Sequence, residues 1–356
     1  MTDKYRIDSH KLIYHVDRVN SWLSGQDVYP IYLEISPSGT CNHRCTFCAL
    51  DFMGYKRQFL DTAILLERIT EMAELGIKSI MYAGEGEPFL HKDMTDIIAH
   101  TKSSGIDVAL TTNGVLLKPS IAGKVMQHTE WIKVSIAAGT KQTYAKIHRT
   151  KESDFDTVIA NMKEAAIIKK RHNYKCTLGM QMLCLPENHN EAITLTQIAS
   201  DIGMDYLVIK PYSHHPHTIH ENYKDIRYAD YMHLADKLEG YNTGNFSVVF
   251  RANAMKKWDD GVRRYDRCNA LPFWSYIDST GGLWGCSAYL GDNRFYCGNV
   301  IDNTFKEVWH SARREDVMKM VSTELDINNC RLNCRMDAVN AYLWELTHPP
   351  EHVNFI

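Results

Sequence analysis

The sequence predicts an α/β protein in which a partial (β/α)6 barrel is followed by a small α+β domain. Three observations lead to this fold class. Between residues 29 and 211, short β-branched runs alternate with longer amphipathic stretches, which is the pattern of strands alternating with helices. Such alternation favours parallel strands joined by right-handed crossovers, and six units are too few to close an eight-unit barrel. The alternation then stops at the histidine-rich run 213–217, and a second cysteine-rich region follows.

The expected elements follow one another in a regular order along the chain. Strands are expected at Ile31–Ser36, Ser79–Ala83, Val108–Thr112, Trp131–Ile136, Thr177–Leu185 and Tyr206–Lys210. Helices are expected between them at Asp61–Leu75, Lys92–Ser104, Ile121–Gln127, Asp154–Lys170 and Asn190–Ile202, with a short one from Lys141. A helical stretch (Tyr228–Leu238) and a short strand (Phe246–Arg251) come next. The chain therefore divides into an extension (1–28), the barrel (29–215), a bridging region (216–255) and a cysteine-rich domain (256–356).

The composition excludes several classes of protein. With 40 basic and 43 acidic residues, the formal charge of −3 gives no electrostatic footprint for nucleic acid. No apolar run reaches the ~18 residues of a membrane span, and the mixed charges at the N-terminus are unlike a signal peptide. Ten cysteines are too few for a disulfide-stapled secreted domain of this length, and their clustering indicates metal ligation in a reducing cytoplasm. We therefore expect a cytoplasmic protein without a nucleic-acid or membrane partner.

Three cysteines, Cys41, Cys45 and Cys48, directly follow the first predicted strand, where loops at the carboxyl ends of parallel strands build active sites. A structural zinc site takes four protein ligands, but no His or Cys stands close behind Cys48, and His43 would strain to reach the same ion. A [4Fe–4S] cluster normally takes four cysteines, so three leave one iron open for an outside ligand. A fragment of a zinc loop is the alternative interpretation.

The spacing Cys-x3-Cys-x2-Cys, with the aromatic Phe47 before the last cysteine, resembles the radical SAM superfamily. The resemblance implies a TIM-like partial barrel whose open iron chelates S-adenosylmethionine (SAM) through its amino and carboxylate groups. It implies that the reduced cluster cleaves SAM and releases a 5′-deoxyadenosyl radical, with the electron supplied by a flavodoxin- or ferredoxin-type donor.

Further segments after the predicted strands match the same family. Ala83-Gly-Glu-Gly-Glu-Pro88 is similar to its Gly-Gly-Glu-Pro element, with Glu85 in place of the first glycine, and Thr111-Thr-Asn-Gly114 is similar to another family segment. The resemblance implies the following SAM-contacting residues: Phe47, Gly84, Glu85, Gly86, Glu87, Asn113, Ser135, Arg149 and Leu185. An ordinary acidic turn at 83–88 and an exposed helix-end Arg149 are the alternatives.

A second set of cysteines lies near the C-terminus. Cys268 is followed by twelve residues, Gly281, four residues and Cys286, and the later pair is Cys330-Arg-Leu-Asn-Cys334. Four cysteines suit a fully ligated second [4Fe–4S] cluster, and a zinc site with four cysteine ligands is the alternative. The arrangement resembles the SPASM/Twitch extension of radical SAM enzymes, and in its shorter Twitch form it holds one auxiliary cluster.

Four residues are candidates for steps on the substrate. Lys210 and His214 lie at the carboxyl end of a strand, where a proton acceptor is expected, although Lys210 also suits a structural ion pair. Cys184 and Cys297 are candidate hydrogen-atom donors, and core packing is the alternative for both. Cys297 also suits a cluster ligand. After the last ligand, Arg335, Asp337, Asn340 and Tyr342 either cap the cluster or face the substrate.

These features favour an enzyme that acts on a small polyhydroxy, sugar or aminosugar-type molecule. Its radical would abstract a hydrogen atom, and the auxiliary cluster would take the remaining electron, so that an alcohol is oxidised to a carbonyl. Epimerisation with a cysteine hydrogen donor is a close alternative. A ribosomal-peptide maturase is another, but only about 29 residues precede the first strand, fewer than a leader-binding domain of about 80–90 residues needs. A structural zinc-binding protein is the non-enzyme alternative.

Overall fold

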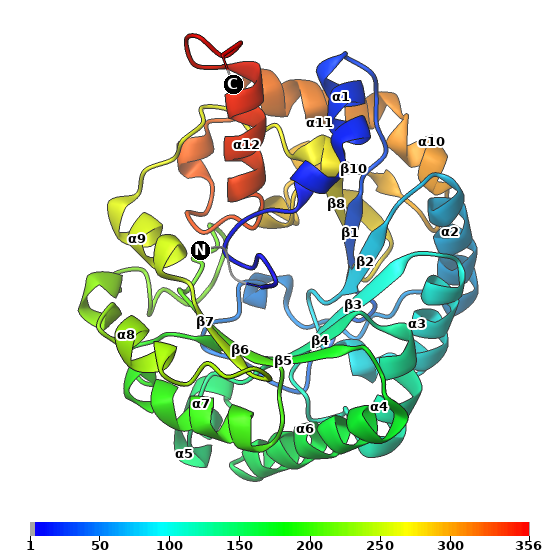
Figure 1. Ribbon diagram of the computed structural model, residues 1–356. Helices are drawn as coiled ribbons and strands as arrows, with labels where there is room; N and C mark the ends of the chain where they lie inside the picture. The colour runs from blue at the N-terminus through cyan, green and yellow to red at the C-terminus, as the bar shows by residue number, and fades with distance from the viewer. Residues whose placement is uncertain (1–3, 356) are drawn as a thin grey trace.

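The computed structural model describes residues 4–355. Its central feature is one ten-stranded sheet in the order β10-β9-β8-β1-β2-β3-β4-β5-β6-β7, which curves into an open barrel with the helices on its outer side (Figure 1). The strands are β1 (Tyr32–Ile35), β2 (Ser79–Tyr82), β3 (Asp107–Thr112), β4 (Trp131–Ser135), β5 (Thr177–Leu183), β6 (Tyr206–Lys210), β7 (Ser247–Phe250), β8 (Trp274–Ile277), β9 (Gly282–Trp284) and β10 (Tyr296–Asn299). The predicted α/β class is confirmed.

One α-helix precedes the first strand, others separate strands β1 to β8 as the alternation predicts, and three follow the last strand. They are α1 (Val16–Leu23), α2 (Thr62–Glu74), α3 (Met94–Ser103), α4 (Pro119–Val125), α5 (Lys141–His148), α6 (Ser153–His172), α7 (Ala192–Asp201), α8 (Leu234–Glu239), α9 (Ala252–Asp260), α10 (Phe305–Trp309), α11 (Ala312–Thr323) and α12 (Asp337–Thr347). The start of α2 is set by Asp61, whose carboxylate accepts a hydrogen bond from the Ile64 backbone N–H at 3.0 Å. This is the N-cap interaction that the sequence predicts. No helix within residues 4–355 is long and apolar enough to cross a membrane.

The parallel part of the sheet is larger than expected. Strands β1 to β7 pair in parallel in chain order, so that the short strand expected near 246–251 is a seventh barrel strand rather than part of a bridging region. Strand β8 adds to the free edge of β1, also in parallel, with Tyr32 opposite Trp274. The long connection after β6 hides β7 from the alternation rule, because no regular helix of ordinary length marks the crossover.

The barrel strands present one face to the helices and the other to the interior. Leu33 and Ile35 of β1 and Ile132 and Val134 of β4 are fully buried in the main apolar core. Because side chains alternate along a strand, the neighbouring residues face inward, and they are largely polar. Those that line the interior include Tyr32, Glu34, Thr111, Lys133, Ser135, Gln181 and Lys210. The alternation therefore turns one face of each strand into core and the other into a site.

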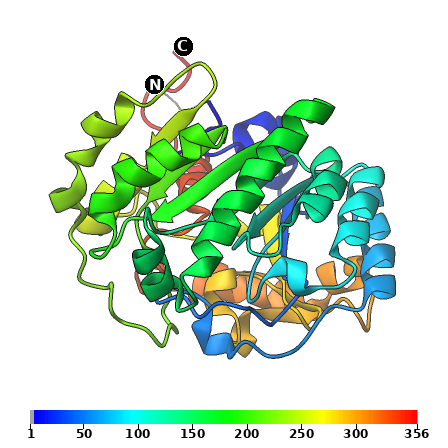
Figure 2. The same cartoon turned by 90° about the horizontal axis from the view of Figure 1, so that it is seen from below.

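The cysteine-rich region packs onto the outside of the barrel as well as extending its sheet. The carboxylate of Glu71 in α2 accepts hydrogen bonds from the backbone N–H groups of Phe305 and Lys306, at 2.9 and 2.8 Å. An acidic side chain at a helix N-terminus satisfies N–H groups that have no partner in the helix. Figure 2 shows the same proximity, with the orange segment that contains α10 beside the light-blue helix α2. The two regions share one sheet and one core.

Candidate active site

One large cavity, of about 1780 Å³, occupies the interior of the barrel. Ligand sites for one small molecule usually measure about 300–1,000 Å³, so this volume has room for a cofactor and a second molecule. Its wall combines the inward-facing strand residues with the first set of cysteines, Cys41, Cys45 and Cys48, and with Cys334 from the second set. Residues expected at the cofactor and at the C-terminal cluster thus border the same space.

The first cysteine loop is fastened to the end of helix α5. The backbone N–H groups of Arg44 and Thr46 donate to the carbonyls of His148 and Ile147, at 3.1 and 2.8 Å. Burial raises the pKa of the Cys41 thiol to about 12, and the negative charge of Glu87 adds to this effect. Thiolates are therefore unfavourable here without a positive partner, which a metal cluster supplies. Three partly buried thiols at the cavity wall fit a cluster with one open coordination position.

His148 makes a contact with this loop that sequence reasoning missed. Its Nδ1 lies 3.2 Å from Cys45 Sγ, and its Nε2 accepts a hydrogen bond from the Ala137 N–H at 3.1 Å. The proton of this buried, neutral imidazole is therefore on Nδ1, which donates to the sulfur. Burial lowers the pKa of His148 well below its usual value, which keeps the ring in this form. The sequence analysis singled out the next residue, Arg149, and not His148.

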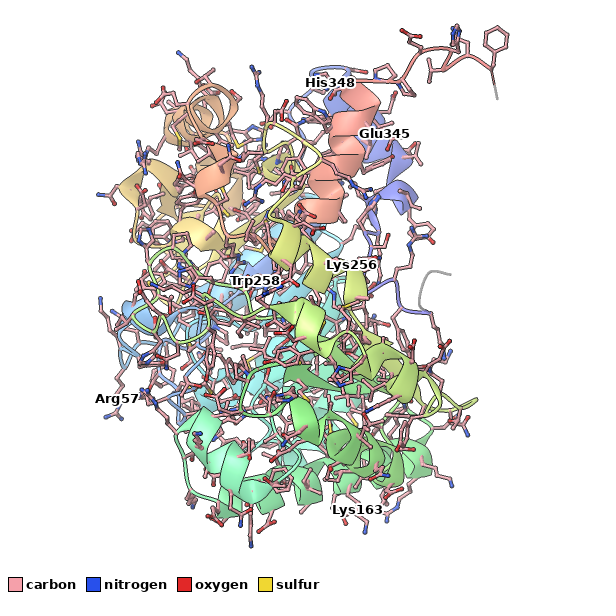
Figure 3. The ribbon with its side chains drawn as sticks, turned by 90° about the vertical axis from the view of Figure 1, so that its left-hand side faces the viewer. Arg57, Lys163, Lys256, Trp258, Glu345 and His348 are labelled. Carbon is pink, nitrogen blue, oxygen red and sulfur yellow. The ribbon has the colours of Figure 1, made fainter. Side chains whose placement is uncertain are left out.

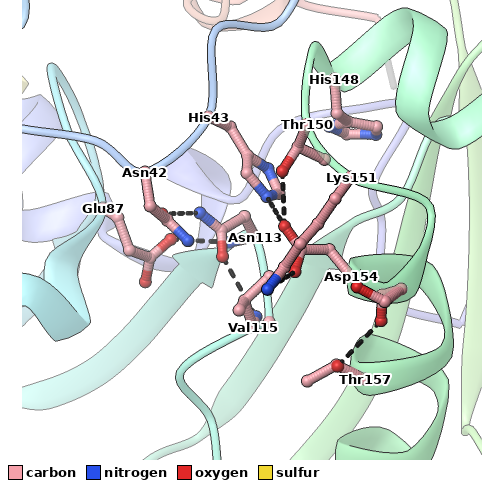
Figure 4. Close-up of polar contacts among 12 residues, drawn as sticks. Asn42, His43, Glu87, Asn113, Val115, His148, Thr150, Lys151, Asp154 and Thr157 are labelled. Atoms are coloured by element: carbon pink, nitrogen blue, oxygen red, sulfur yellow. Dashed lines mark hydrogen bonds and ion pairs between the residues drawn. The ribbon is translucent and has the colours of Figure 1, made fainter.

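A zinc site on nearby histidines is the alternative that this geometry weighs against. Ligand atoms of His43, Cys45 and His148 lie within 4.8 Å of one another, the one such group of three among residues 4–355. Both nitrogens of His148 are already engaged, however, one as donor and one as acceptor. His43 directs Nε2 at Asp154 Oδ2, 3.5 Å away (Figure 4). These histidines support the loop instead of completing a tetrahedral metal site.

The segment after β2 reaches the cavity through its glycines. Gly84 and Gly86 line the cavity, and a Cβ on Gly86 would lie only 2.0 Å from the Thr40 carbonyl oxygen. The carboxylate of Glu87 accepts from the Thr112 hydroxyl at 2.6 Å and from the Asn113 N–H at 2.8 Å. Burial raises the pKa of Glu87. This carboxylate thus fixes the loop after β3 to the loop after β2.

The structure brings together most of the residues expected at SAM, but not all of them. Those that line the cavity are Phe47, Gly84, Gly86, Glu87, Asn113 and Ser135. Glu85 points elsewhere, because its carboxylate accepts from the Ser279 N–H at 2.8 Å. Arg149 lies outside the lining, with its guanidinium 3.2 Å from His220 Nε2, and Leu185 is fully buried in the core. Glu85 and Leu185 are packing residues in this structure.

Of the four residues expected to act on the substrate, only Lys210 lines the cavity. His214 is outside it. Cys184 is fully buried in the core, where burial raises the pKa of its thiol to about 12. Cys297 is buried in β10 with Sγ 3.8 Å from the Phe295 carbonyl oxygen. Core packing, the alternative that the sequence left open, describes both thiols.

The second set of cysteines surrounds a separate small cavity. Cys268, Cys286, Cys330 and Cys334 all line this space of about 30 Å³, together with apolar side chains such as Leu271, Phe295 and Ile327. Each sulfur has a hydrogen-bonding neighbour at 3.0–3.6 Å: Asn340 Nδ2, the Ala288 N–H, Tyr289 Oη and the Met336 N–H, in the same order. Cys297 is not part of the lining. Four converging thiols in an apolar shell fit a fully ligated cluster, which Asn340 would cap through its hydrogen bond to Cys268.

The fold and the two sets of cysteines define an α/β-barrel protein with two metal-cofactor sites, one open to a large cavity and one closed. Residues 35–196 match the radical SAM superfamily and residues 268–335 match the SPASM iron-sulfur cluster-binding domain, so the chain contains a radical SAM domain and a SPASM-type iron–sulfur domain. These two domains imply SAM, a [4Fe–4S] cluster and an auxiliary iron–sulfur cluster as cofactors.

Individual relatives agree with this assignment. The probable GTP 3′,8-cyclase of Metallosphaera sedula is 29% identical over 178 residues, which are 49% of this chain and 53% of that protein. The chain thus spans about half the length of the curated relatives it matches. The structure of Streptococcus suis SuiB bound to precursor peptide SuiA has a TM-score of 0.66 and 19% identity, covering 84% of this chain and 69% of that one. Native anSMEcpe with bound AdoMet has a TM-score of 0.60 and 18% identity, covering 89% and 95%. The two structures share the fold.

Replacing Gly86 by Ala should separate the loops that carry the site. The new Cβ would clash with the carbonyls of Thr40 and Ser38, so we expect a stability loss of about 2 kcal/mol and a lower iron content. Thermal unfolding and iron analysis of the reconstituted protein measure both. Gly123→Ala in α4 is the matched control, because its Cβ meets nothing closer than 3.9 Å. A Gly86→Ala protein as stable as the Gly123→Ala protein would contradict the close approach.

Replacing His148 by Leu should make the SAM-binding cluster harder to reduce. In the parent protein, the N–H···S hydrogen bond stabilises the reduced cluster. Its loss removes about 1 kcal/mol of differential stabilisation, which corresponds to a shift on the order of 40 mV to lower reduction potential. An EPR-monitored redox titration measures the shift. Tyr144→Phe is the control, since the Tyr144 ring stacks on His148 at 4.2 Å but its hydroxyl has no hydrogen-bond partner within residues 4–355. An unchanged potential in an intact cluster would refute the role.

Proposed function

We propose that this radical SAM enzyme abstracts a hydrogen atom from a small polyhydroxy, sugar or aminosugar-type substrate and oxidises an alcohol carbon to a carbonyl. The observation that carries the proposal is Cys334, which lines both the large cavity and the closed four-cysteine site. When bound, SAM on the first cluster supplies a 5′-deoxyadenosyl radical and the cluster on the second set of cysteines supplies an electron acceptor. Oxidation needs both functions beside one substrate.

We assign the cofactor-binding roles by position. Cys41, Cys45 and Cys48 would hold the first cluster, and the backbone at Gly84 and Gly86 would bind SAM, with Asn113 and Ser135 as further polar contacts. The second cluster would be held by Cys268, Cys286, Cys330 and Cys334. A flavodoxin- or ferredoxin-type protein is the proposed electron donor. Arg149, outside the cavity lining, is left without a role at SAM.

The cavity is enclosed by segments from both ends of the chain. The N-terminal segment lines it with residues from Tyr5 to Lys11, and Asp8 pairs with Arg251 at 2.9 Å. Figure 1 shows this blue segment crossing the barrel. On the other side, Arg335 pairs with Glu34 of β1, which joins the C-terminal region to the barrel wall. Both ends of the chain thus contribute to the wall of the cavity.

The structure favours oxidation over epimerisation because the two thiols expected as hydrogen donors, Cys184 and Cys297, both lie outside the cavity lining. A second candidate function comes from the curated relatives, whose name describes the cyclisation of GTP. Sequence identity of 29% over half the chain favours keeping a nucleotide rearrangement as that second candidate. A peptide substrate has no comparable support, because the similarity to the peptide-bound SuiB is limited to the fold.

The two sets of cysteines should behave as independent cluster sites. Replacing Cys41, Cys45 and Cys48 by Ala should remove about four irons per chain, the content of one [4Fe–4S] cluster, and abolish formation of 5′-deoxyadenosine. About four irons should remain on the second set. Cys297→Ala is the control and should keep full iron. Zinc without iron in the triple variant would refute the auxiliary cluster.

The product should show which reaction follows hydrogen abstraction. In deuterated buffer, oxidation gives a carbonyl product without solvent deuterium at the attacked carbon, whereas a thiol donor would deliver one deuterium to a redox-neutral epimer. Mass spectrometry of products from candidate sugars and sugar nucleotides distinguishes the two. We expect Cys184→Ala and Cys297→Ala proteins that retain iron to turn over like the parent. A deuterated epimer would overturn the proposed oxidation while leaving the superfamily assignment intact.

A further inference from the structure

Three partly buried, positively charged side chains line the inner wall of the large cavity without a carboxylate partner. They are Lys133 in β4, Lys210 at the end of β6, and Arg331 between two cysteines of the second set. Among residues 4–355, no Asp or Glu forms an ion pair with any of them. The Nε of Arg331 is buried and has no hydrogen-bond partner among residues 4–355. The cavity therefore contains an excess of positive charge at one wall.

Three other cations of the same lining are neutralised, whereas Lys11, Lys256 and Arg264 are exposed to solvent and Arg6 donates to Tyr14 and Ser9. Arg251 pairs with Asp8, Lys257 with Asp337, and Arg335 with Glu34. The contrast matters because buried lysines and arginines are rarely left unpaired, and an uncompensated buried charge is strongly unfavourable. Three unpaired cations beside three paired ones indicate a binding site for an external anion.

The electrostatics of the three cations point the same way. Burial lowers the pKa of Lys210 well below its usual value, and the positive charges of Lys133, Arg251 and Arg331 lower it further. Burial likewise lowers the pKa of Lys133 to about 8, with a contribution from Arg251. The side chains are thus close enough to repel one another. A bound anion offsets this repulsion and favours the protonated form of both lysines.

Resting on the proposed function, we propose that the substrate carries a phosphoryl group, as a sugar phosphate or a sugar attached to a diphosphate does, and that Lys133, Lys210 and Arg331 bind it. A carboxylate brings one negative charge, whereas a phosphate monoester brings about 1.5 to 2, and a diphosphate suits three cations. Lysine binds phosphate as a point charge and arginine as a bidentate fork.

The proposed phosphoryl-binding site is distinct from the site that would bind SAM. Strands β3, β4 and β5 separate β6, which carries Lys210, from β2 and the Gly84–Gly86 segment that would bind SAM. Arg331 comes from a different region again, beside Cys330 and Cys334. Lys210 and Arg331 therefore lie on the side of the cavity nearer the second set of cysteines, where the substrate is proposed to be oxidised, and Lys133 lies between them and the proposed SAM contacts, on the same strand as Ser135.

A proton-acceptor role for Lys210 is the competing interpretation, and one substitution separates the two. Lys210→Arg keeps the charge but cannot accept a proton, because arginine stays protonated in proteins. Lys210→Met removes the charge. Anion binding predicts that the Arg variant resembles the parent and the Met variant does not, while proton transfer predicts that both lose turnover and keep the anion affinity.

The test is anaerobic calorimetry of the reconstituted protein with inorganic pyrophosphate, inorganic phosphate and acetate as probes. We expect pyrophosphate and phosphate to bind more tightly than acetate. Lys210→Met and Arg331→Met should each weaken pyrophosphate about tenfold or more, and Lys210→Arg should keep most of the affinity. Lys163→Met is the matched control, because Lys163 lies on the outer surface of α6, far from the cavity (Figure 3). Iron content checks that Arg331→Met retains both clusters.

The outcomes separate this inference from the proposed function. Pyrophosphate that binds the Lys210→Met and Arg331→Met proteins as well as the parent, or acetate that binds as tightly as phosphate, overturns the phosphoryl site even if SAM cleavage is normal. Loss of 5′-deoxyadenosine formation or of iron in the parent overturns the function, whatever the anion affinity. Tighter binding of pyrophosphate than of phosphate supports a diphosphate-linked substrate, and the reverse order supports a monophosphate.

Discussion

The strict two-residue alternation of side chains along the barrel strands governs the rest of this structure. Leu33 and Ile35 must face the helices to build the core, so Tyr32 and Glu34 must face the interior. The same rule directs Lys133 of β4 into the cavity while its neighbours on either side fill the core. A shift of one residue would exchange core and cavity on that strand. The chemistry of the site is thus fixed by the packing of the opposite face.

The sequence was sufficient wherever the signal is local. The strand Tyr206–Lys210 has the bounds that its β-branched run predicts, and Asp61 begins α2 as a capping residue should. The spacing of the first cysteine set is also local, and the structure places the more widely spaced four cysteines of the second set around one space. Contacts between distant segments were not predictable in this way. His148 contacts Cys45, which is more than a hundred residues away in the sequence. No periodic pattern in the sequence predicts such a contact.

The differences between the expected and the observed structure have the same cause. Glu85 stands where the family pattern has its first glycine, and its carboxylate accepts a hydrogen bond from the Ser279 N–H in the turn between β8 and β9. That turn is almost two hundred residues away and reaches the segment only because β8 joins β1 in parallel. Strand β7 was assigned to a bridging region because the connection before it lacks a regular crossover helix of ordinary length. In each case, long-range pairing decided what a short pattern left open.

The two cysteine sites differ in the way their coordination demands. The first has three thiols at the wall of a cavity large enough for a cofactor and a substrate, and the second has four thiols in a small apolar space. The unpaired cations at the far wall would then do more than raise the affinity for the substrate. If they hold a part of the substrate that does not react, the binding energy of that part positions the reacting carbon between the two sites. Such positioning is needed most when a radical attacks whichever C–H bond lies nearest, so an anchor remote from the reacting carbon is the means by which this cavity would select one bond among several similar ones.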